Sequence, residues 1–162
     1  MDDLNVRTYQ PEDQAAILAL FDQGLLTGQV APNDTGADIE HIQDAYFDSE
    51  RHHFWVATLH DQVVGMIGVA SDEEHTAEVR RLRVQKDLQN TPIASQLLTI
   101  ALDHCKVHGY LKVLLDTRFE REEAVDLFEK VGFQHTRTKN VHGKDLLEFY
   151  LDIYRQDSPT DE

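Results

Sequence analysis

The stretch EVRRLRVQKDLQNTPIA, from Glu78 to Ala94, joins a strand pattern to a helix through a short polar loop. Thr91 is a suitable N-cap and Pro92 a suitable first residue for that helix, whose apolar periodicity continues to His108. The first N–H groups of a helix have no internal partner, and the helix dipole favours negative charge there. The junction therefore predicts a binding site for phosphate groups.

The strand half of this stretch has no clean apolar face. Strict alternation from Ala77 to Val84 would put arginine and aliphatic side chains together on both faces of the strand. A β-bulge, which inserts one extra residue and reverses the alternation beyond it, would resolve the mixture. We therefore predict a bulge in this strand.

Length and charge limit the class of protein. The chain has 162 residues, enough for one domain with a sizeable core. Lysine and arginine number 15 and aspartate and glutamate 30, so the formal charge is −15. This charge repels phosphate backbones and anionic membranes, so we expect neither a nucleic-acid nor a membrane partner.

Cysteine content and the N-terminal residues indicate the compartment. The single cysteine, Cys105, excludes an internal disulfide framework, and its place on the apolar side of a helix indicates a packed thiol. The first residues lack the pattern of a secretion signal, and no apolar run approaches the ~20 residues that span a bilayer. We expect a cytoplasmic protein.

Hydrophobic periodicity and turn residues predict alternating strands and helices. The first half predicts a strand at 6–9, a helix at 11–25, a loop at 27–36 and a second helix at 37–47. Two strands follow, at 54–59 and 63–70, and they are joined by a turn at His60-Asp61. The second half predicts a strand at 77–84, a helix at 92–108, a buried strand at 111–116 and a helix at 122–131 that is capped by Gly132. The last two strands, at 133–139 and 146–154, form a hairpin. This is an α/β layout with a mixed sheet. The loop at 27–36 is either a substrate lid or an exposed connection.

Three stretches together resemble the GNAT superfamily of acyl-CoA-dependent N-acetyltransferases, most of all its camello-like branch. They are VRRLRV (79–84), DHCKVHGYLKVLLDT (103–117) and EEAVDLFEKVGF (122–133). The resemblance implies an α/β fold with a mixed, mostly antiparallel central sheet flanked by helices. It implies one domain over residues 1–154, followed by a polar tail at 155–162.

The resemblance also implies an activity and a site. The expected reaction is acetyl transfer from acetyl-CoA, as co-substrate, to the amine of a small molecule such as an amino acid or its conjugate, by direct attack in a ternary complex. Glu78 falls where many members have the carboxylate that draws the proton from the amine. The implied cofactor-binding positions are Leu82, Arg83, Val84, Gln89, Asn90, Thr91, Ile93, Ala94, Arg121 and Phe128.

Three positions depart from the family pattern. Pro92 replaces a central glycine of the pyrophosphate loop and lacks an N–H, a loss of about 1–3 kcal/mol if that donor bonds a charged oxygen. Phe128 stands where a tyrosine usually protonates the departing thiolate, and Arg121 stands where an asparagine often contacts the cofactor. A missing general acid costs typically ~10²–10⁴-fold in rate, and Tyr110 and Tyr150 are substitutes only if they are not simply buried.

Several alternatives stay open at this point. Glu78 is either the catalytic base or half of a surface ion pair with a neighbouring arginine. The second alternative concerns Arg80, Arg81 and Arg83, which either bind a substrate carboxylate or are surface residues of the sheet. The whole chain is either an enzyme or a catalytically degenerate acyl-CoA-binding or protein-interaction module. His104 and His108, spaced i, i+4, suggest a metal site only weakly, and we expect none. The final hairpin could pair two copies as a homodimer or be covered within one.

Overall fold

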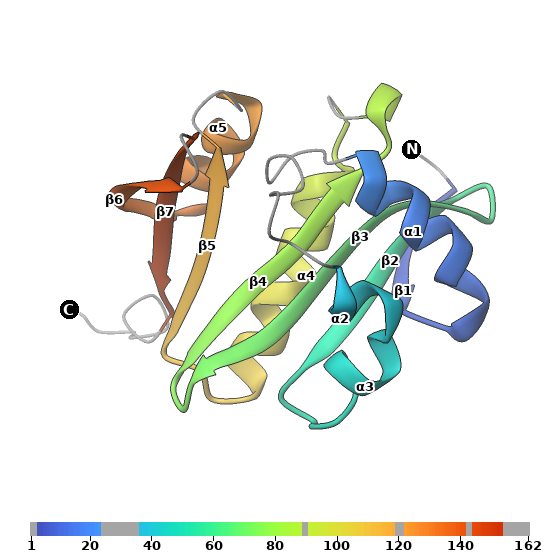
Figure 1. Cartoon of the computed structure of the whole chain (residues 1–162), viewed down its shortest axis with the longest axis horizontal. Helices are drawn as coiled ribbons and strands as arrows, with labels where there is room; N and C mark the ends of the chain where they lie inside the picture. Colours follow the sequence, from blue (N-terminus) through green and yellow to red (C-terminus); the bar gives the residue numbers. More distant parts are fainter. Residues whose placement is uncertain (1–2, 24–35, 89–90, 119–121, 142–143, 154–162) are drawn as a thin grey trace.

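A computed structural model of the chain describes residues 3–23, 36–88, 91–118, 122–141 and 144–153. These residues contain a seven-stranded sheet in the order β1-β2-β3-β4-β5-β7-β6 (Figure 1). Only β4 and β5 pair in parallel, and every other neighbouring pair is antiparallel. The strands are β1 (Leu4–Thr8), β2 (His53–Leu59), β3 (Gln62–Glu73), β4 (Thr76–Val84), β5 (Lys112–Arg118), β6 (Gln134–Val141) and β7 (Lys144–Asp152). The predicted mixed, mostly antiparallel sheet is confirmed.

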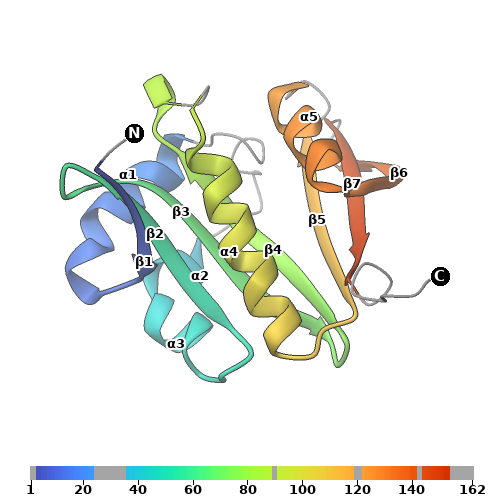
Figure 2. The same ribbon diagram turned by 180° about the vertical axis from the view of Figure 1, so that it is seen from behind.

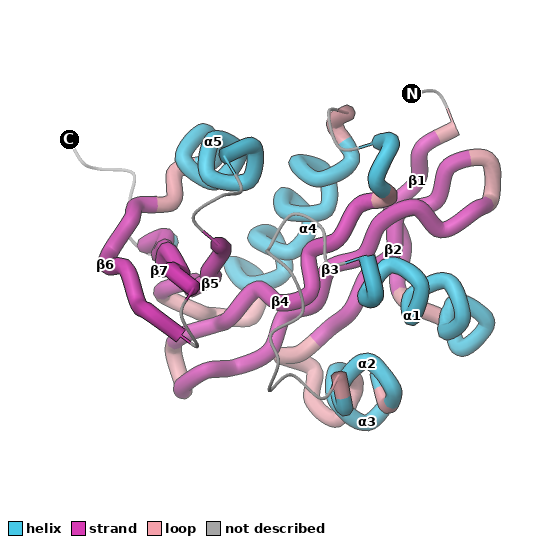
Figure 3. Tube along the Cα trace, turned by 45° about the horizontal axis from the view of Figure 1, so that its top comes forward, coloured by secondary structure: helices cyan, strands magenta, loops and turns pink. Residues whose placement is uncertain are grey.

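Helices cover both faces of the sheet (Figures 2 and 3). One face carries α4 (Ile93–Val107) and α5 (Glu122–Val131), whose Leu97, Leu98 and Phe128 belong to the larger of two apolar clusters. The other face carries α1 (Gln14–Gln23), α2 (Ala37–Glu40) and α3 (Ile42–Tyr46), which form the smaller cluster with the central strands. The sheet therefore separates two apolar cores, one on each of its faces, as expected for a layered α/β domain.

The strands β2, β3 and β4 follow one another as an antiparallel meander, as predicted. The turn between β2 and β3 places both His60 and Asp61 at positive φ, 52° and 65°. Two left-handed residues match the twist of the flanking strands, which explains why a polar pair serves here without glycine. The turn between β3 and β4 is short, because β3 continues to Glu73 and β4 begins at Thr76.

The helix predicted over 37–47 is wrong in its continuity. His41, at φ −135° and ψ 56°, leaves the helical region and divides the segment into α2 and α3. The helix predicted from Pro11 begins instead as a 3₁₀ turn (Pro11–Asp13) that leads into α1. Most of the predicted lid, residues 27–35, and the polar tail at 155–162 lie outside the described residues.

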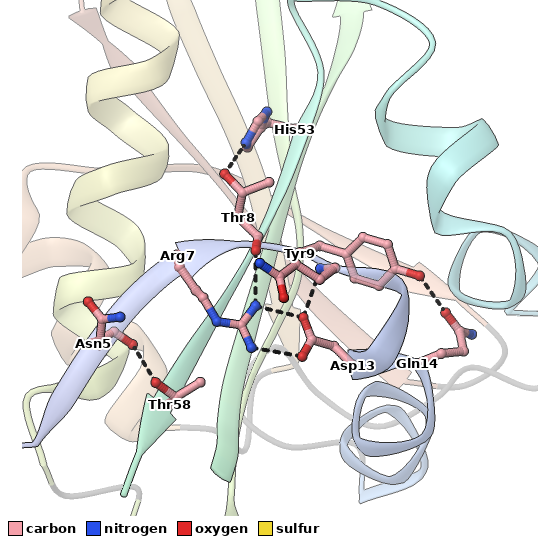
Figure 4. Close-up of polar contacts among 9 residues, drawn as sticks. Asn5, Arg7, Thr8, Tyr9, Asp13, Gln14, His53 and Thr58 are labelled. Carbon is pink, nitrogen blue, oxygen red and sulfur yellow. Dashed lines mark hydrogen bonds and ion pairs between the residues drawn. The ribbon is translucent and has the colours of Figure 1, made fainter. Parts of the chain in front are cut away.

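An ion pair holds the junction between β1 and this turn (Figure 4). The Arg7 guanidinium donates to both carboxylate oxygens of Asp13 at 2.9 Å, and the Gln10 N–H donates to the same group at 2.8 Å. Burial alone would raise the pKa of Asp13, but the donors from Arg7 and Gln10 outweigh burial and lower it. The acidic turn thereby fixes the start of α1 against the sheet.

None of the helices in the described part of the chain is both long and apolar enough to cross a bilayer.

Candidate active site

The strand β4 contains the bulge that the charge pattern predicts. Gly68 of β3 pairs with Arg80 and Met66 pairs with Arg83, so Arg81 and Leu82 together lie opposite the single residue Ile67. Arg81 has φ +59°, the left-handed conformation that a bulge of this kind requires. The extra residue reverses the alternation of side chains from this point onward.

The bulge sorts the side chains of β4 into two chemically distinct faces. Before the bulge Ala77 and Val79 join the core under α4, and after it Leu82 and Val84 do the same. The opposite face, toward α1, α2 and α3, receives the charged side chains. We call Glu78, Arg80, Arg81 and Arg83 the polar face of β4.

Parallel pairing between β4 and β5 ends early. Thr76 to Glu78 pair with Lys112 to Leu114, and both strands continue for several residues without further pairing to each other. Figures 1 and 2 show the strands spreading apart toward the end at which α4 begins. Leu82 and Val84 lie on the diverging part with fully buried side chains, so any contact with a cofactor there is limited to their backbone.

Glu78 is the last residue of β4 that pairs with β5, opposite Leu114. Its side chain is 32% exposed, and Arg80 Nε donates to its Oε1 at 2.7 Å. The ion pair that the sequence suggested is therefore present, and at this exposure it contributes about 0–1 kcal/mol. The carboxylate still has access to solvent, which a base acting through water requires.

The helix α4 begins one residue later than predicted. Pro92 (φ −75°, ψ 6°) occupies the N-cap position and Ile93 is the first helical residue. Thr91 is not the cap, because its hydroxyl donates to the carbonyl of Leu88 at 2.5 Å and closes the preceding 3₁₀ turn (Lys86–Leu88). Among the described residues, no side-chain hydrogen bond caps this end of α4 at Pro92, and the first N–H groups, at Ile93 and Ala94, have no partner inside the helix.

The family model described as the Acetyltransferase (GNAT) family matches residues 22–133, more than half of the chain. The chain belongs to the GNAT family. Its Glu78, its bulged β4 and its uncapped α4 all lie within the matched region.

This GNAT chain is similar to two named relatives and to one solved structure. It is 30% identical over 104 residues to a probable N-acetyltransferase camello of Xenopus tropicalis, an alignment that covers 63% of this chain and 48% of the relative. It is 33% identical over 99 residues to human N-acetylaspartate synthetase, covering 60% of this chain and 33% of the relative. The chain thus matches half or less of the length of these relatives. A candidate acetyltransferase from Salmonella typhimurium, solved with its cofactor acetyl-CoA, has the same fold with a TM-score of 0.80, 17% identity and 99% coverage of both chains.

Seven of the ten predicted cofactor positions lie in the described residues and three do not. Ile93 and Ala94 bury their side chains under the sheet and present only backbone at the start of α4. Gln89, Asn90 and Arg121 lie outside the described residues. Their predicted contacts with acetyl-CoA stay predictions.

Phe128 of this GNAT chain is a core residue. Its ring is fully buried and packs edge-on against Phe133 and Phe149, at centroid distances of 6.1 and 5.7 Å. It has no proton to donate, and its predicted contact with the cofactor stays a prediction. The two tyrosines considered as substitutes are both hydrogen-bonded: Tyr110 is buried against Ser71 at 2.5 Å, and Tyr150 donates to Gln134 at 3.2 Å.

The histidines of α4, His104 and His108, are partly buried. His104 packs against Trp55, His53 and His108 at centroid distances of 5.2, 5.5 and 4.2 Å. Its Nε2–H donates to the Arg51 carbonyl at 2.9 Å, so this nitrogen is not available to a metal. No metal-binding group of three or more side chains occurs among the residues described.

Sequence reasoning missed the side chains that face the polar face of β4 from the helices. Arg81 forms a two-pronged pair with Asp38 of α2, at 2.6 and 3.0 Å, and lies over the ring of Phe21 at 4.9 Å. Tyr46 of α3 donates to the same carboxylate at 2.6 Å. These partners lie about 30 to 55 residues before β4 along the chain, and no local pattern of residues marks the contact.

Proposed function

We propose that this chain transfers an acetyl group from acetyl-CoA to the amine of a small molecule by direct attack in a ternary complex, with Glu78 accepting the proton of the amine. The position of Glu78 carries the proposal. It lies where β4 and β5 separate, on the face toward α1 to α3, with partial access to solvent. An ammonium has no lone pair for attack, so a carboxylate at the point where the two reactants meet supplies the required base.

The residues of the chain fit a coenzyme A thioester. The uncapped start of α4 offers backbone N–H groups and a positive dipole end to a pyrophosphate. The diverging part of β4, from Leu82 to Val84, offers backbone groups to the acyl arm. Pro92 removes one donor from the cap position, so we expect weaker binding than a residue with an N–H would allow.

The chemistry balances without a metal or a redox partner. When bound, acetyl-CoA supplies a thioester whose carbonyl carbon bonds to the nitrogen as its bond to sulfur breaks. Glu78 takes the first proton, which the ammonium loses before attack. The nitrogen loses its second proton to solvent as the amide forms, and the sulfur takes a proton from solvent. Holding both reactants in one orientation supplies much of the acceleration.

For the acceptor we propose an amino acid, whose carboxylate would lie near Arg80. Arg80 is 40% exposed and lies on the same face as Glu78. The name of one relative, N-acetylaspartate synthetase, supports this class. The Arg81 side chain is only 15% exposed and Arg83 only 3%, which makes Arg80 the arginine most accessible to a ligand.

Calorimetric titration with acetyl-CoA, followed by a thiol-release assay on a panel of amines, tests the proposal. We expect binding below millimolar concentration, turnover with amino acids, and a loss of about 10²–10⁴-fold in kcat for Glu78→Gln. Glu74→Gln, with its carboxylate 83% exposed on the turn before β4, is the matched control and should keep full activity. No binding at millimolar acetyl-CoA would end the proposal, and turnover only with amines that lack a carboxylate would refute the acceptor class.

The second candidate is a non-catalytic acyl-CoA-binding module on the same fold. It is favoured by the buried Phe128 at the position of the family's usual acid and by the proline at the start of α4. Binding of acetyl-CoA without release of thiol in the presence of any amine would support it. A homodimer and a cytoplasmic location stay predictions.

A further inference from the structure

Arg81, the left-handed residue of the β4 bulge, has an unusual backbone for its residue type. Three residues other than glycine have positive φ in the described part of the chain, and two of them, His60 and Asp61, form the turn between β2 and β3. Arg81 is the third, at φ +59°, and it lies inside a strand with a side chain that is 15% exposed. Glycine adopts this conformation without strain, whereas a residue with a Cβ needs its surroundings to compensate. The contacts of the Arg81 side chain therefore have to offset that cost.

Side chains from three helices hold Arg81. Asp38 of α2 accepts two hydrogen bonds from its guanidinium, from Nη2 at 2.6 Å and from Nε at 3.0 Å. Tyr46 of α3 is fully buried and donates to the same carboxylate at 2.6 Å. The guanidinium also lies over the ring of Phe21 of α1, 4.9 Å from its centroid. Three helices on one face of the sheet thus converge on a single side chain of β4.

Asp38 is ionised in this arrangement, although its side chain is only 19% exposed. Burial alone would raise the pKa of Asp38, but the hydrogen bonds from Arg81 and Tyr46 and the charge of Arg81 outweigh burial and lower it. A two-pronged pair between a carboxylate and a guanidinium fixes direction as well as distance. The pair therefore restrains the rotation of the guanidinium and, through it, the backbone of the bulge.

The pair lies between the two halves of the proposed ternary complex. Glu78, three residues before Arg81, is the last residue of β4 that pairs with β5. The backbone directly after Arg81, from Leu82 to Val84, is the part assigned above to the acyl arm. Asp38 lies on one of the helices that cover the face of Glu78 (Figure 3). A rotation of the backbone at Arg81 would therefore turn the groups that hold the acyl arm relative to the base.

We propose that Asp38 and Arg81 are positioning residues for the acetyl transfer proposed above, on which this inference rests. Their ion pair fixes the bulge of β4 against α2, so that the backbone after the bulge holds the thioester in a constant orientation to Glu78. Neither side chain touches a reacting atom in this assignment. An arginine stands at the bulge in spite of its left-handed backbone because its side chain ties the bulge to the helices, and glycine has no side chain to do so.

The kinetic test uses Asp38→Asn, which keeps the size of the side chain but removes its charge and one of its two acceptor oxygens. We expect kcat to fall about tenfold because the reactants lose their orientation, with little change in the KM for acetyl-CoA because the start of α4 is unaltered. Arg81→Lys, whose ammonium cannot form the two-pronged pair, should cause the same loss. The double variant should be no slower than either single variant, since residues that act as one unit are not additive. Losses that multiply, or an unchanged kcat, would overturn the inference.

The matched control is Asp13→Asn, in the ion pair between β1 and the first 3₁₀ turn. Arg7 donates to both oxygens of Asp13 at 2.9 Å, and Asp13 is 5% exposed, so this pair is also two-pronged and largely buried (Figure 4). It lies beside the edge strand β1 and not on β4. Asp13→Asn should lower stability in urea about as much as Asp38→Asn and leave kcat unchanged. Equal losses of kcat in the two variants would mean that the pair at Asp38 serves only folding, which also overturns the inference.

A second readout does not depend on turnover. The backbone N–H signal of Leu82 in a ¹⁵N–¹H spectrum reports the orientation of the strand directly after the bulge. It should move in Asp38→Asn and stay in place in Asp13→Asn. A Leu82 signal that does not move in Asp38→Asn, where the wild type is active, refutes this inference alone. A wild-type protein that binds acetyl-CoA and acetylates no amine refutes the proposed function, and the positioning role of Asp38 and Arg81 with it.

Discussion

At the scale of single residues, two glycines show how space and backbone conformation act separately. Gly68 has no room for a side chain, whereas a Cβ on Gly109 would meet nothing within 4 Å. Gly109 instead has φ +81°, at the end of α4. One position is glycine because of its neighbours, and the other because of its own backbone.

We predict that Gly68→Ala lowers the free energy of unfolding by about 1–3 kcal/mol, because the new methyl group would overlap Phe54 and Tyr46. Urea unfolding measures the change. In Gly109→Ala the space is open, so only the cost of the left-handed backbone remains, about 1–2 kcal/mol. Of the two, Gly68→Ala should cause the larger loss of stability; a larger loss in Gly109→Ala would contradict this.

At the scale of elements, β4 owes its two faces to one extra residue. The same sequence without a bulge would turn Leu82 and Val84 away from α4 and turn Arg83 toward it. Arg81 carries the left-handed conformation and is also tied to α2 through Asp38. The bulge therefore determines both the core and the candidate site.

Deletion of Arg81 should remove the bulge and restore plain alternation, so that Leu82 and Val84 still face α4 and Arg83 still faces away from it. The expected loss in the free energy of unfolding is that of the pair with Asp38, about 1–3 kcal/mol. Thermal unfolding followed by circular dichroism measures the loss. Arg81→Gly is the matched variant, because it keeps the residue count and the bulge while losing the same pair. A deletion that is far less stable than Arg81→Gly would contradict this expectation.

The start of α4 yields a second prediction at this scale. Pro92→Ala restores an N–H at the cap position, and a hydrogen bond to a charged phosphate contributes about 1.5–3 kcal/mol. Acetyl-CoA should therefore bind about tenfold or more tightly in calorimetry. Pro11→Ala makes the same change at the start of another helical turn and should leave the dissociation constant alone. An unchanged constant in Pro92→Ala would show that the cap position does not contact the cofactor.

At the scale of the whole molecule, the histidine cluster between β2 and α4 couples stability to pH. Burial, together with neighbouring histidines, lowers the pKa of both His53 and His104 below the ordinary value of about 6.5. The groups around them are His108, His52, Trp55 and the Arg51 carbonyl. The folded protein thus holds these two imidazoles neutral.

The sign of the effect follows from proton linkage. Below about pH 6.5 the unfolded chain binds more protons than the folded one at these two residues, so stability is complete above that pH and falls as pH drops. Urea unfolding at pH 5.5, 6.5 and 7.5 measures the slope. His104→Gln should flatten it, whereas His60→Gln, at a side chain that is 72% exposed, should not. A slope equal in both variants would rule out the cluster as its source.

Much of this molecule could be predicted from local pattern. Amphipathic periodicity placed the long helix α4, and the polar pair His60-Asp61 predicted a tight turn that the structure confirms. The charged alternation of β4 predicted the bulge, because only an extra residue could give that strand an apolar face. The break at His41 and the cap at Pro92 were predicted wrongly, since each depends on one backbone angle or one hydrogen bond at a helix end.

By itself, the sequence determined the order of the elements, the family and the residue at the point where β4 leaves β5. These depend on short-range periodicity and on motifs that lie close together along the chain. Only the tertiary structure decided that Arg81 pairs with Asp38, and that His104 packs against Trp55. The physical reason is distance along the chain: these contacts form between segments about 30 to 50 residues apart, where chain packing and not local propensity sets which side chains meet.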